Sequence, residues 1–97
     1  MATHTVLFAA SASKSLMEIP SKDDSARVRR RLEALSTMPY MGAVYDPTFE
    51  TAQPPYELRA TYAGHYGIYY VFDEEADTVY VAFIEDSRRD PKHRFRT

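Results

Sequence analysis

Apolar positions change their spacing near residue 56, from a helical repeat to a strand repeat. Before that point, four apolar residues recur at intervals of three and four, which is typical of an amphipathic helix. Ser21 offers an N-cap for this helix, and Pro39 ends it. The four residues are Val28, Leu32, Leu35 and Met38.

The second half of the chain predicts three strands. In the first of them, Leu58 and Ala60 face one way and Arg59 faces the other, because side chains alternate along a strand. The segments 65–73 and 78–85 carry apolar side chains on both faces, as interior strands do. A cluster of acidic residues between these two segments predicts a hairpin turn.

The first half adds an edge strand over residues 3–9 and a short helix around Leu16 and Ile19, which Pro20 ends. The connection 39–55 holds four of the six prolines and no sustained period, which predicts a long loop with room for one short strand. We therefore expect an α+β fold: an N-terminal strand, a two-helix hairpin, an antiparallel β-meander and a short basic C-terminal tail. The helices should cover one face of the sheet.

Composition limits the classes of function. A chain of 97 residues fits a single domain over 1–97, and the lack of cysteine excludes disulfides, a thiol nucleophile and a thiolate metal site. No apolar stretch approaches the length of a membrane span, and the N-terminal pattern is not that of a secretory signal, so we expect a cytoplasmic protein without a membrane partner. A net charge of −2 and a pI near 5.9 argue against a generally basic surface. Any anion-binding site must be local.

Positive charge gathers in two places. The last ten residues carry five basic side chains against one acid and form a cationic tail. Arg27, Arg29, Arg30 and Arg31 lie on the predicted helix, where successive residues are about 100° apart. We interpret this second group as a solvated helix surface, with Arg29 paired to Glu33.

Standard catalytic signatures are missing. The sequence has no Gly-rich phosphate loop, nucleophile elbow or HExxH motif. His4, His65 and His93 lie far apart in the sequence and have no metal-ligand spacing. A metal site is therefore not expected.

An ordered set of features between Tyr56 and Phe95 resembles the C-terminal half of the RelE/ParE superfamily, the bacterial toxins of type II toxin–antitoxin pairs. Members typically show a strand with Leu-Arg, a strand of the form Tyr-Arg-aliphatic-x-Tyr, an acidic turn, a Val-rich strand and a closing Arg-Arg-Asp followed by an aromatic residue. The corresponding segments here are YELR, HYGIYY, DEEAD, TVYVAF and SRRDPKHRF. The earlier SASKSLMEIP, followed by a basic helix and Pro39, agrees with the family's usual opening.

The resemblance implies an RNA-binding enzyme without metal or cofactor that cleaves messenger RNA, often in the ribosomal decoding site, and that a cognate antitoxin holds inactive. Such cleavage needs a base for the 2′-OH, an acid for the leaving oxygen and fixed cations around the phosphate. We assign catalytic roles to Arg59, Arg89 and His93, with His93 as general acid or base. The residues assigned to RNA binding are Arg88, His65, Tyr69, Lys92 and Phe95.

Structural interpretations of the same residues stay open. Arg59 can pair with Glu57 or Glu85 across strands, and His93 can be an exposed terminal histidine. The tyrosines of the segment 65–73, Tyr69 among them, can serve sheet packing rather than base stacking.

Gly67 stands where the family commonly has an arginine that grips the reacting phosphate. Removing one such group typically lowers the rate by about 10² to 10³. Either the vacant space lets His65, Tyr69 or a tail arginine reach the cleft, or the glycine marks a β-bulge without catalytic meaning. The low pI is a second departure, because toxins that work inside the ribosome are usually strongly basic.

Three functions remain under consideration. The favoured one is a RelE-like messenger RNA endoribonuclease that inhibits translation. The second is a ParE-like toxin that binds DNA gyrase and cuts nothing, and the third is an inactive RelE-fold protein that binds only its antitoxin. The ribonuclease hypothesis requires arginines from the first strand of the meander and from the tail to converge on one pocket.

Overall fold

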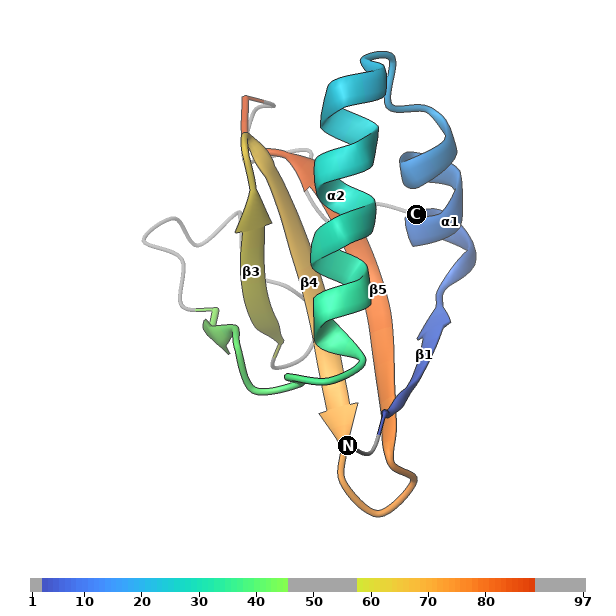
Figure 1. The fold of residues 1–97 in the computed structure, drawn as a ribbon, viewed down its shortest axis with the longest axis vertical. Coiled ribbons are helices and arrows are strands. Elements are labelled where there is room, and N and C mark those ends of the chain that lie inside the picture. The colour runs from blue at the N-terminus through green and yellow to red at the C-terminus, as the bar shows by residue number, and fades with distance from the viewer. Residues whose placement is uncertain (1–2, 46–57, 89–97) are drawn as a thin grey trace.

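The computed structural model describes residues 3–45 and 58–88, which form two helices and one five-stranded sheet (Figure 1). This arrangement confirms the expected α+β fold. In chain order, the elements are β1 (Thr5–Phe8), α1 (Ala10–Met17), α2 (Lys22–Leu35), β2 (Ala43–Val44), β3 (Arg59–Ala63), β4 (Tyr66–Asp73) and β5 (Thr78–Asp86).

The sheet has the strand order β1-β5-β4-β3-β2. Strands β2 to β5 pair antiparallel, as the predicted meander requires, and the two strands with apolar side chains on both faces, β4 and β5, are interior. β1 is an edge strand, but it pairs with β5 in parallel, which the sequence pattern did not indicate. The sheet is therefore mixed. The chain passes from β1 through both helices and three further strands before β5 comes to lie beside β1.

The helices lie together on one face of the sheet (Figure 1). Ser21 caps α2, since its hydroxyl accepts a hydrogen bond from the N–H of Asp24. The predicted apolar stripe of α2 is buried at its first three positions, but Met38 is 54% exposed. The expectation for Met38 was wrong because α2 ends at Leu35, so the helical period no longer places residue 38 on the core face.

Two clusters of buried side chains lie on the two faces of the sheet. The helix-side core joins α1 and α2 to β4 and β5, with Ile68 and Tyr70 among its fully buried members. The second, which we call the open-face cluster, lies on the opposite face. It comprises Leu58, Ala60, Tyr69, Ala82 and Phe83, with Tyr45 and Val71 packed against them.

The hydroxyl of Tyr70 joins the loop after α2 to the sheet. It donates a hydrogen bond to the carbonyl of Pro39 at 2.8 Å and accepts one from the N–H of Gly42 at 2.9 Å. A Cβ at Gly42 would lie 2.6 Å from the carbonyl oxygen of Ala60, so only glycine permits this approach. Burial raises the pKa of the Tyr70 hydroxyl, although the Gly42 hydrogen bond and the charge of Arg59 act in the opposite direction.

Tyr70→Phe should destabilise the protein by about 1–3 kcal/mol, because the change leaves the Gly42 N–H and the Pro39 carbonyl buried without their partner. Urea unfolding measures this difference. Tyr80→Phe is the matched control, since Tyr80 is 42% exposed, and it should change the free energy of unfolding by less than about 0.5 kcal/mol. Equal effects of the two substitutions would contradict the assignment.

Candidate functional site

The side chain of Tyr69 fills the space above Gly67 on the open face of the sheet. A Cβ at position 67 would lie 2.6 Å from the Tyr69 hydroxyl oxygen and 2.8 Å from two ring carbons. Tyr69 is only 1% exposed. The place of the family's phosphate-gripping arginine is thus taken by an aromatic ring of this chain.

Gly67 does not mark a bulge. It is in register with Tyr62 on β3 and with Glu85 on β5. The register shift of the β4–β5 pair lies further along β4, between Tyr69 and Tyr70. That irregularity lets Ala82 and Phe83 of β5 both belong to the open-face cluster.

Aromatic contacts hold the Tyr69 ring in place. Tyr45 meets it edge-on with ring centroids 4.8 Å apart, and Tyr62 does so at 6.4 Å. Such T-shaped pairs stabilise beyond the area that they bury. The open-face cluster therefore has the character of a packed aromatic surface, which agrees with the sheet-packing interpretation of this tyrosine.

Glu85, which the sequence suggested only as a partner for Arg59, brings a carboxylate to the same region. Its register places it opposite Gly67, and it is only 5% exposed. The signal in the sequence is a carboxylate that ends the apolar run of β5, two residues after Phe83 and so on the same face. A buried carboxylate and a phenol thus share the open face, and both groups can take part in proton transfer.

Arg59 points to the other face of the sheet. It faces away from Leu58, as the alternation predicted, and its Nη1 donates to the carbonyl of Gly42 at 2.7 Å. Its guanidinium also lies 5.0 Å from the ring centroid of Tyr40. The alternative pairing with Glu85 is not formed, because Glu85 is across the sheet at the opposite end of β3.

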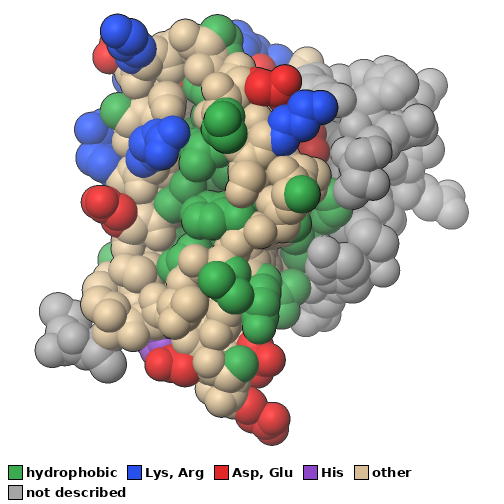
Figure 2. Space-filling model, turned by 90° about the vertical axis from the view of Figure 1, so that its right-hand side faces the viewer, with side chains coloured by type: hydrophobic (Ala, Val, Ile, Leu, Met, Phe, Trp, Pro, Cys, Tyr) green, Lys and Arg blue, Asp and Glu red, His purple; other side chains and the backbone are tan. Residues whose placement is uncertain are grey.

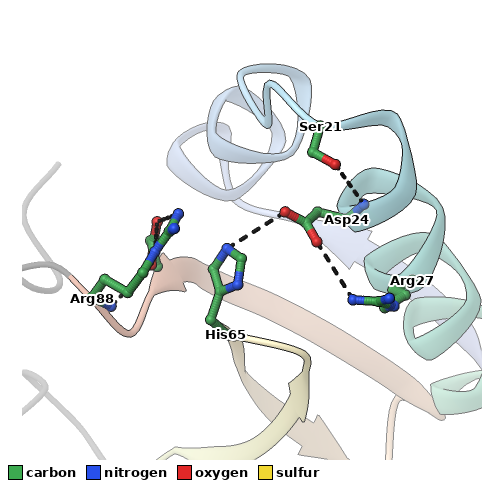
Figure 3. Close-up of polar contacts among 6 residues, drawn as sticks. Ser21, Asp24, Arg27, His65 and Arg88 are labelled. Atoms are coloured by element: carbon green, nitrogen blue, oxygen red, sulfur yellow. Dashed lines mark hydrogen bonds and ion pairs between the residues drawn. The ribbon is translucent and has the colours of Figure 1, made fainter.

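Arg88 and His65 lie together at the end of the sheet where the β3–β4 turn meets the N-terminus of α2 (Figure 3). His65 Nε2 is 3.5 Å from a carboxylate oxygen of Asp24, and Arg27 lies 3.6 Å from the other oxygen. His65 therefore does not share a face with Gly67, contrary to the sequence-based expectation. The reason is that it precedes β4, in the turn where Gly64 has a φ of +62°, so strand alternation does not reach it.

Arg88 forms a fork-like pair with Asp86. Its Nη2 and Nε donate to the carboxylate at 2.7 and 3.0 Å, and its backbone N–H adds a third hydrogen bond. These contacts lower the pKa of Asp86 to about 2, although partial burial acts in the opposite direction. Arg88 is exposed, but its charge is already engaged by Asp86.

The expected convergence of arginines is not seen for the two that the structure describes. Arg59 is in register with Tyr70, whereas Asp86, the partner of Arg88, is in register with Tyr66. The two positions are four residues apart on β4, which is roughly 13 Å along a strand. The other assigned residues, Arg89, Lys92, His93 and Phe95, lie outside the described residues, and their roles stay predictions.

Within residues 3–45 and 58–88, no three His, Asp or Glu side chains are grouped in a way that could hold a metal ion. In the same ranges, neither helix has the length and apolar character needed to cross a membrane.

This chain is similar to solved structures, but not to any family model or curated sequence. No protein-family model and no curated protein matches the chain. The toxin–antitoxin complex RelBE2 from Mycobacterium tuberculosis is similar with a TM-score of 0.66 and 22% identity, over 89% of this chain and 93% of that chain. The archaeal RelE–RelB complex from Pyrococcus horikoshii OT3 has a TM-score of 0.69 and 16% identity, over 91% and 99%. The isolated E. coli RelE toxin has a TM-score of 0.67 and 13% identity, over 90% and 87%.

The chain therefore has the fold of the RelE toxins, as the resemblance in its second half implied. At Gly67, where the sequence resemblance led us to expect an arginine, the space is filled by the ring of Tyr69.

Gly67→Ala should destabilise the protein by about 1–3 kcal/mol, because the new methyl group overlaps the buried Tyr69 ring. In a Tyr69→Ala background, the same change should cost less than about 0.5 kcal/mol, since the ring is gone. Thermal or urea unfolding of the four proteins in this double-mutant cycle measures the coupling. Additive effects would show that the ring does not fill this space.

The Asp86–Arg88 pair should make stability depend on pH in acid. The folded pKa of Asp86 is about 2, below the ordinary value of 3.8, so its contribution is present above about pH 4 and is lost as the pH falls toward 2. Asp86→Asn should flatten the stability curve in that window, and Arg88→Gln should do the same because it removes the same hydrogen bonds. Unfolding midpoints measured from pH 2 to 5 test this, and wild-type slopes in both variants would refute it.

Proposed function

We propose that this chain is the toxin of a type II toxin–antitoxin pair and that it cleaves messenger RNA until an antitoxin binds it. The observation that carries the proposal is the fold: each of the three RelE structures is matched over about nine-tenths of this chain, and two of them are complexes with an antitoxin. The ordered motifs of the second half, from the Leu-Arg strand to the closing Arg-Arg-Asp, support it independently.

The chemistry of cleavage is assigned to the open face. We assign to Glu85 the role of accepting the proton of an attacking 2′-OH. Because Tyr69 is only 1% exposed, a base would stack on the neighbouring ring of Tyr62, which is 49% exposed and which Tyr69 contacts edge-on. Arg89 supplies the cation and His93 the proton for the leaving oxygen, both proposed from the sequence. Arg59 acts as a positioning residue, because its hydrogen bond holds the loop at Gly42 against the sheet.

In this proposal, the residues that bind RNA beside the open face are Arg88, Lys92, Phe95 and His65. Arg88 and His65 are described, and they lie at the same end of the sheet. Because Asp86 already neutralises Arg88, a phosphate there would have to displace a carboxylate, and we expect Arg88 to contribute less than Arg89.

The antitoxin partner is expected to cover apolar surface with an amphipathic helix. Next to the open-face cluster, Tyr62 is 49% exposed, and its ring contacts that of Tyr69. An apolar helix face packs against such side chains, and an acidic flank would complement the cationic tail.

A second candidate is a protein that binds its antitoxin and cuts nothing. One observation favours it: the ring of Tyr69 occupies the space above Gly67, where the resemblance led us to expect an arginine. The experiment that tests cleavage also decides between the two.

Expression without an antitoxin should arrest growth, and Arg89→Ala and His93→Gln should each relieve the arrest. Loss of one charge-stabilising or proton-transferring group lowers such rates by about 10² to 10³. Arg96→Ala, which removes a tail arginine without an assigned role, is the matched control and should leave the arrest intact. Primer extension on cellular messages after induction should show new 5′ ends that the two variants lose.

Other outcomes separate the alternatives. A wild-type chain that causes no arrest would support the antitoxin-binding candidate. Arrest with intact messages and blocked supercoiling by gyrase would support a ParE-like activity instead.

A further inference from the structure

A groove lined by arginines runs between α2 and the β3–β4 turn, away from the open face. Its volume is about 260 Å³. We call it the arginine groove; its lining residues are Arg27, Arg30, Arg31, Ala34, Ala63 and Gly64.

Helical spacing explains why three arginines reach one groove. Arg27, Arg30 and Arg31 are related by three and four residues, so they share one face of α2 and span about 6 Å of its axis. Arg29 lies on another face, where its Nε donates to Ser25 and it lines a different groove. All four arginines are exposed, as the interpretation of a solvated helix surface predicted, but three of them line one groove, and the expected Arg29–Glu33 pair is not among the ion pairs of the described residues.

The charges of the arginine groove are poorly neutralised by the described part of the chain. Arg30 and Arg31 form no ion pair or side-chain hydrogen bond there, and both are exposed. Arg27 has one contact at 3.6 Å with Asp24, a carboxylate that it shares with His65. Like charges at this spacing destabilise a helix, so their arrangement is explained better by an anionic ligand than by folding.

The other lining residues of the arginine groove distinguish between anionic ligands. Ala34 of α2 and, across from it, Ala63 and Gly64 offer no side chain larger than a methyl group, so a peptide helix finds no pocket for a large apolar anchor. The neighbouring groove, of about 510 Å³ between α2, α1 and β1, has such a lining in Val6, Phe8, Leu16 and Leu32. Phosphate groups need only charge, access and the fork of a guanidinium.

The separation of charge along the molecule also favours binding of a nucleic acid near the β3–β4 turn, where the arginine groove lies. The β3–β4 turn and the acidic β4–β5 turn lie at opposite ends of the sheet (Figure 1). On the side shown in Figure 2, all visible Lys and Arg side chains lie in the upper half, where acidic side chains lie among them, whereas the lower tip carries acidic side chains and no Lys or Arg. A polyanion is thus attracted to one end although the net charge is −2.

We infer that the arginine groove binds the phosphate backbone of single-stranded RNA and anchors it without taking part in cleavage. This site goes beyond the proposed function, because it holds phosphates whether or not the chain cuts the strand.

The test is fluorescence anisotropy of the full-length chain with a short 2′-O-methyl oligoribonucleotide, which lacks the 2′-OH needed for cleavage. The variant Arg27→Gln, Arg30→Gln, Arg31→Gln should weaken binding by at least about tenfold near 50 mM salt, and the slope of log K against log salt should fall by up to about 2, since each phosphate contact to a single strand contributes about 0.7. The matched control is Lys14→Gln, Lys22→Gln, Arg29→Gln, which removes the same charge elsewhere and should stay within about twofold of the wild type.

Equal weakening by the two triple variants would overturn the proposal, since it would reflect net charge alone. Unchanged RNA binding by the groove variant, with loss of binding to a fluorescent oligoglutamate peptide, would overturn it in favour of an acidic peptide. Circular dichroism must show the same helix content for both variants, as the good helix propensity of Gln leads us to expect. Failure of messenger cleavage in cells leaves this result unaffected, because the probe cannot be cut.

Discussion

The buried hydroxyl of Tyr70 is the contact on which the rest of the arrangement depends. It holds the loop after α2 against the sheet, because it donates a hydrogen bond to the Pro39 carbonyl and accepts one from the Gly42 N–H. The lack of a Cβ at Gly42 permits this close approach. The same loop then offers the Gly42 carbonyl to Arg59. A guanidinium held in this way satisfies a buried polar group, so it stays on the helix side of the sheet and is not available to the open face.

On the open face, an aromatic ring lies at the position where the resemblance led us to expect a positively charged side chain. A family member with arginine at the position of Gly67 would present a fixed cation there, whereas in this chain Tyr69 covers the glycine and is packed by Tyr45 and Tyr62. An aromatic surface is suited to a base or to an apolar helix of a partner. The proposed cleavage is therefore assigned to Glu85 and to residues of the cationic tail rather than to a cation at position 67.

Net charge is a poor guide to where this protein can meet a polyanion. The acidic β4–β5 turn lowers the sum, but it lies at the end of the sheet opposite the arginine groove. Screening in physiological salt limits each charge to a range of about 8 Å, so the two ends act almost independently. A mildly acidic chain can therefore carry a strongly basic site.

Local patterns in the sequence were enough to predict the two helices, the meander and the interior positions of β4 and β5, because these follow from periods of 3.6 and 2 and from caps that act within a few residues. The order of short motifs also indicated the RelE-like fold. The parallel pairing of β1, the contact of His65 with Asp24 and the hydrogen bond of Arg59 to Gly42 became visible only in the folded chain. These outcomes depend on contacts between residues far apart in the chain, which local periodicity does not contain. The covering of Gly67 by Tyr69 belongs with them, since it depends on how the open-face cluster packs around the ring.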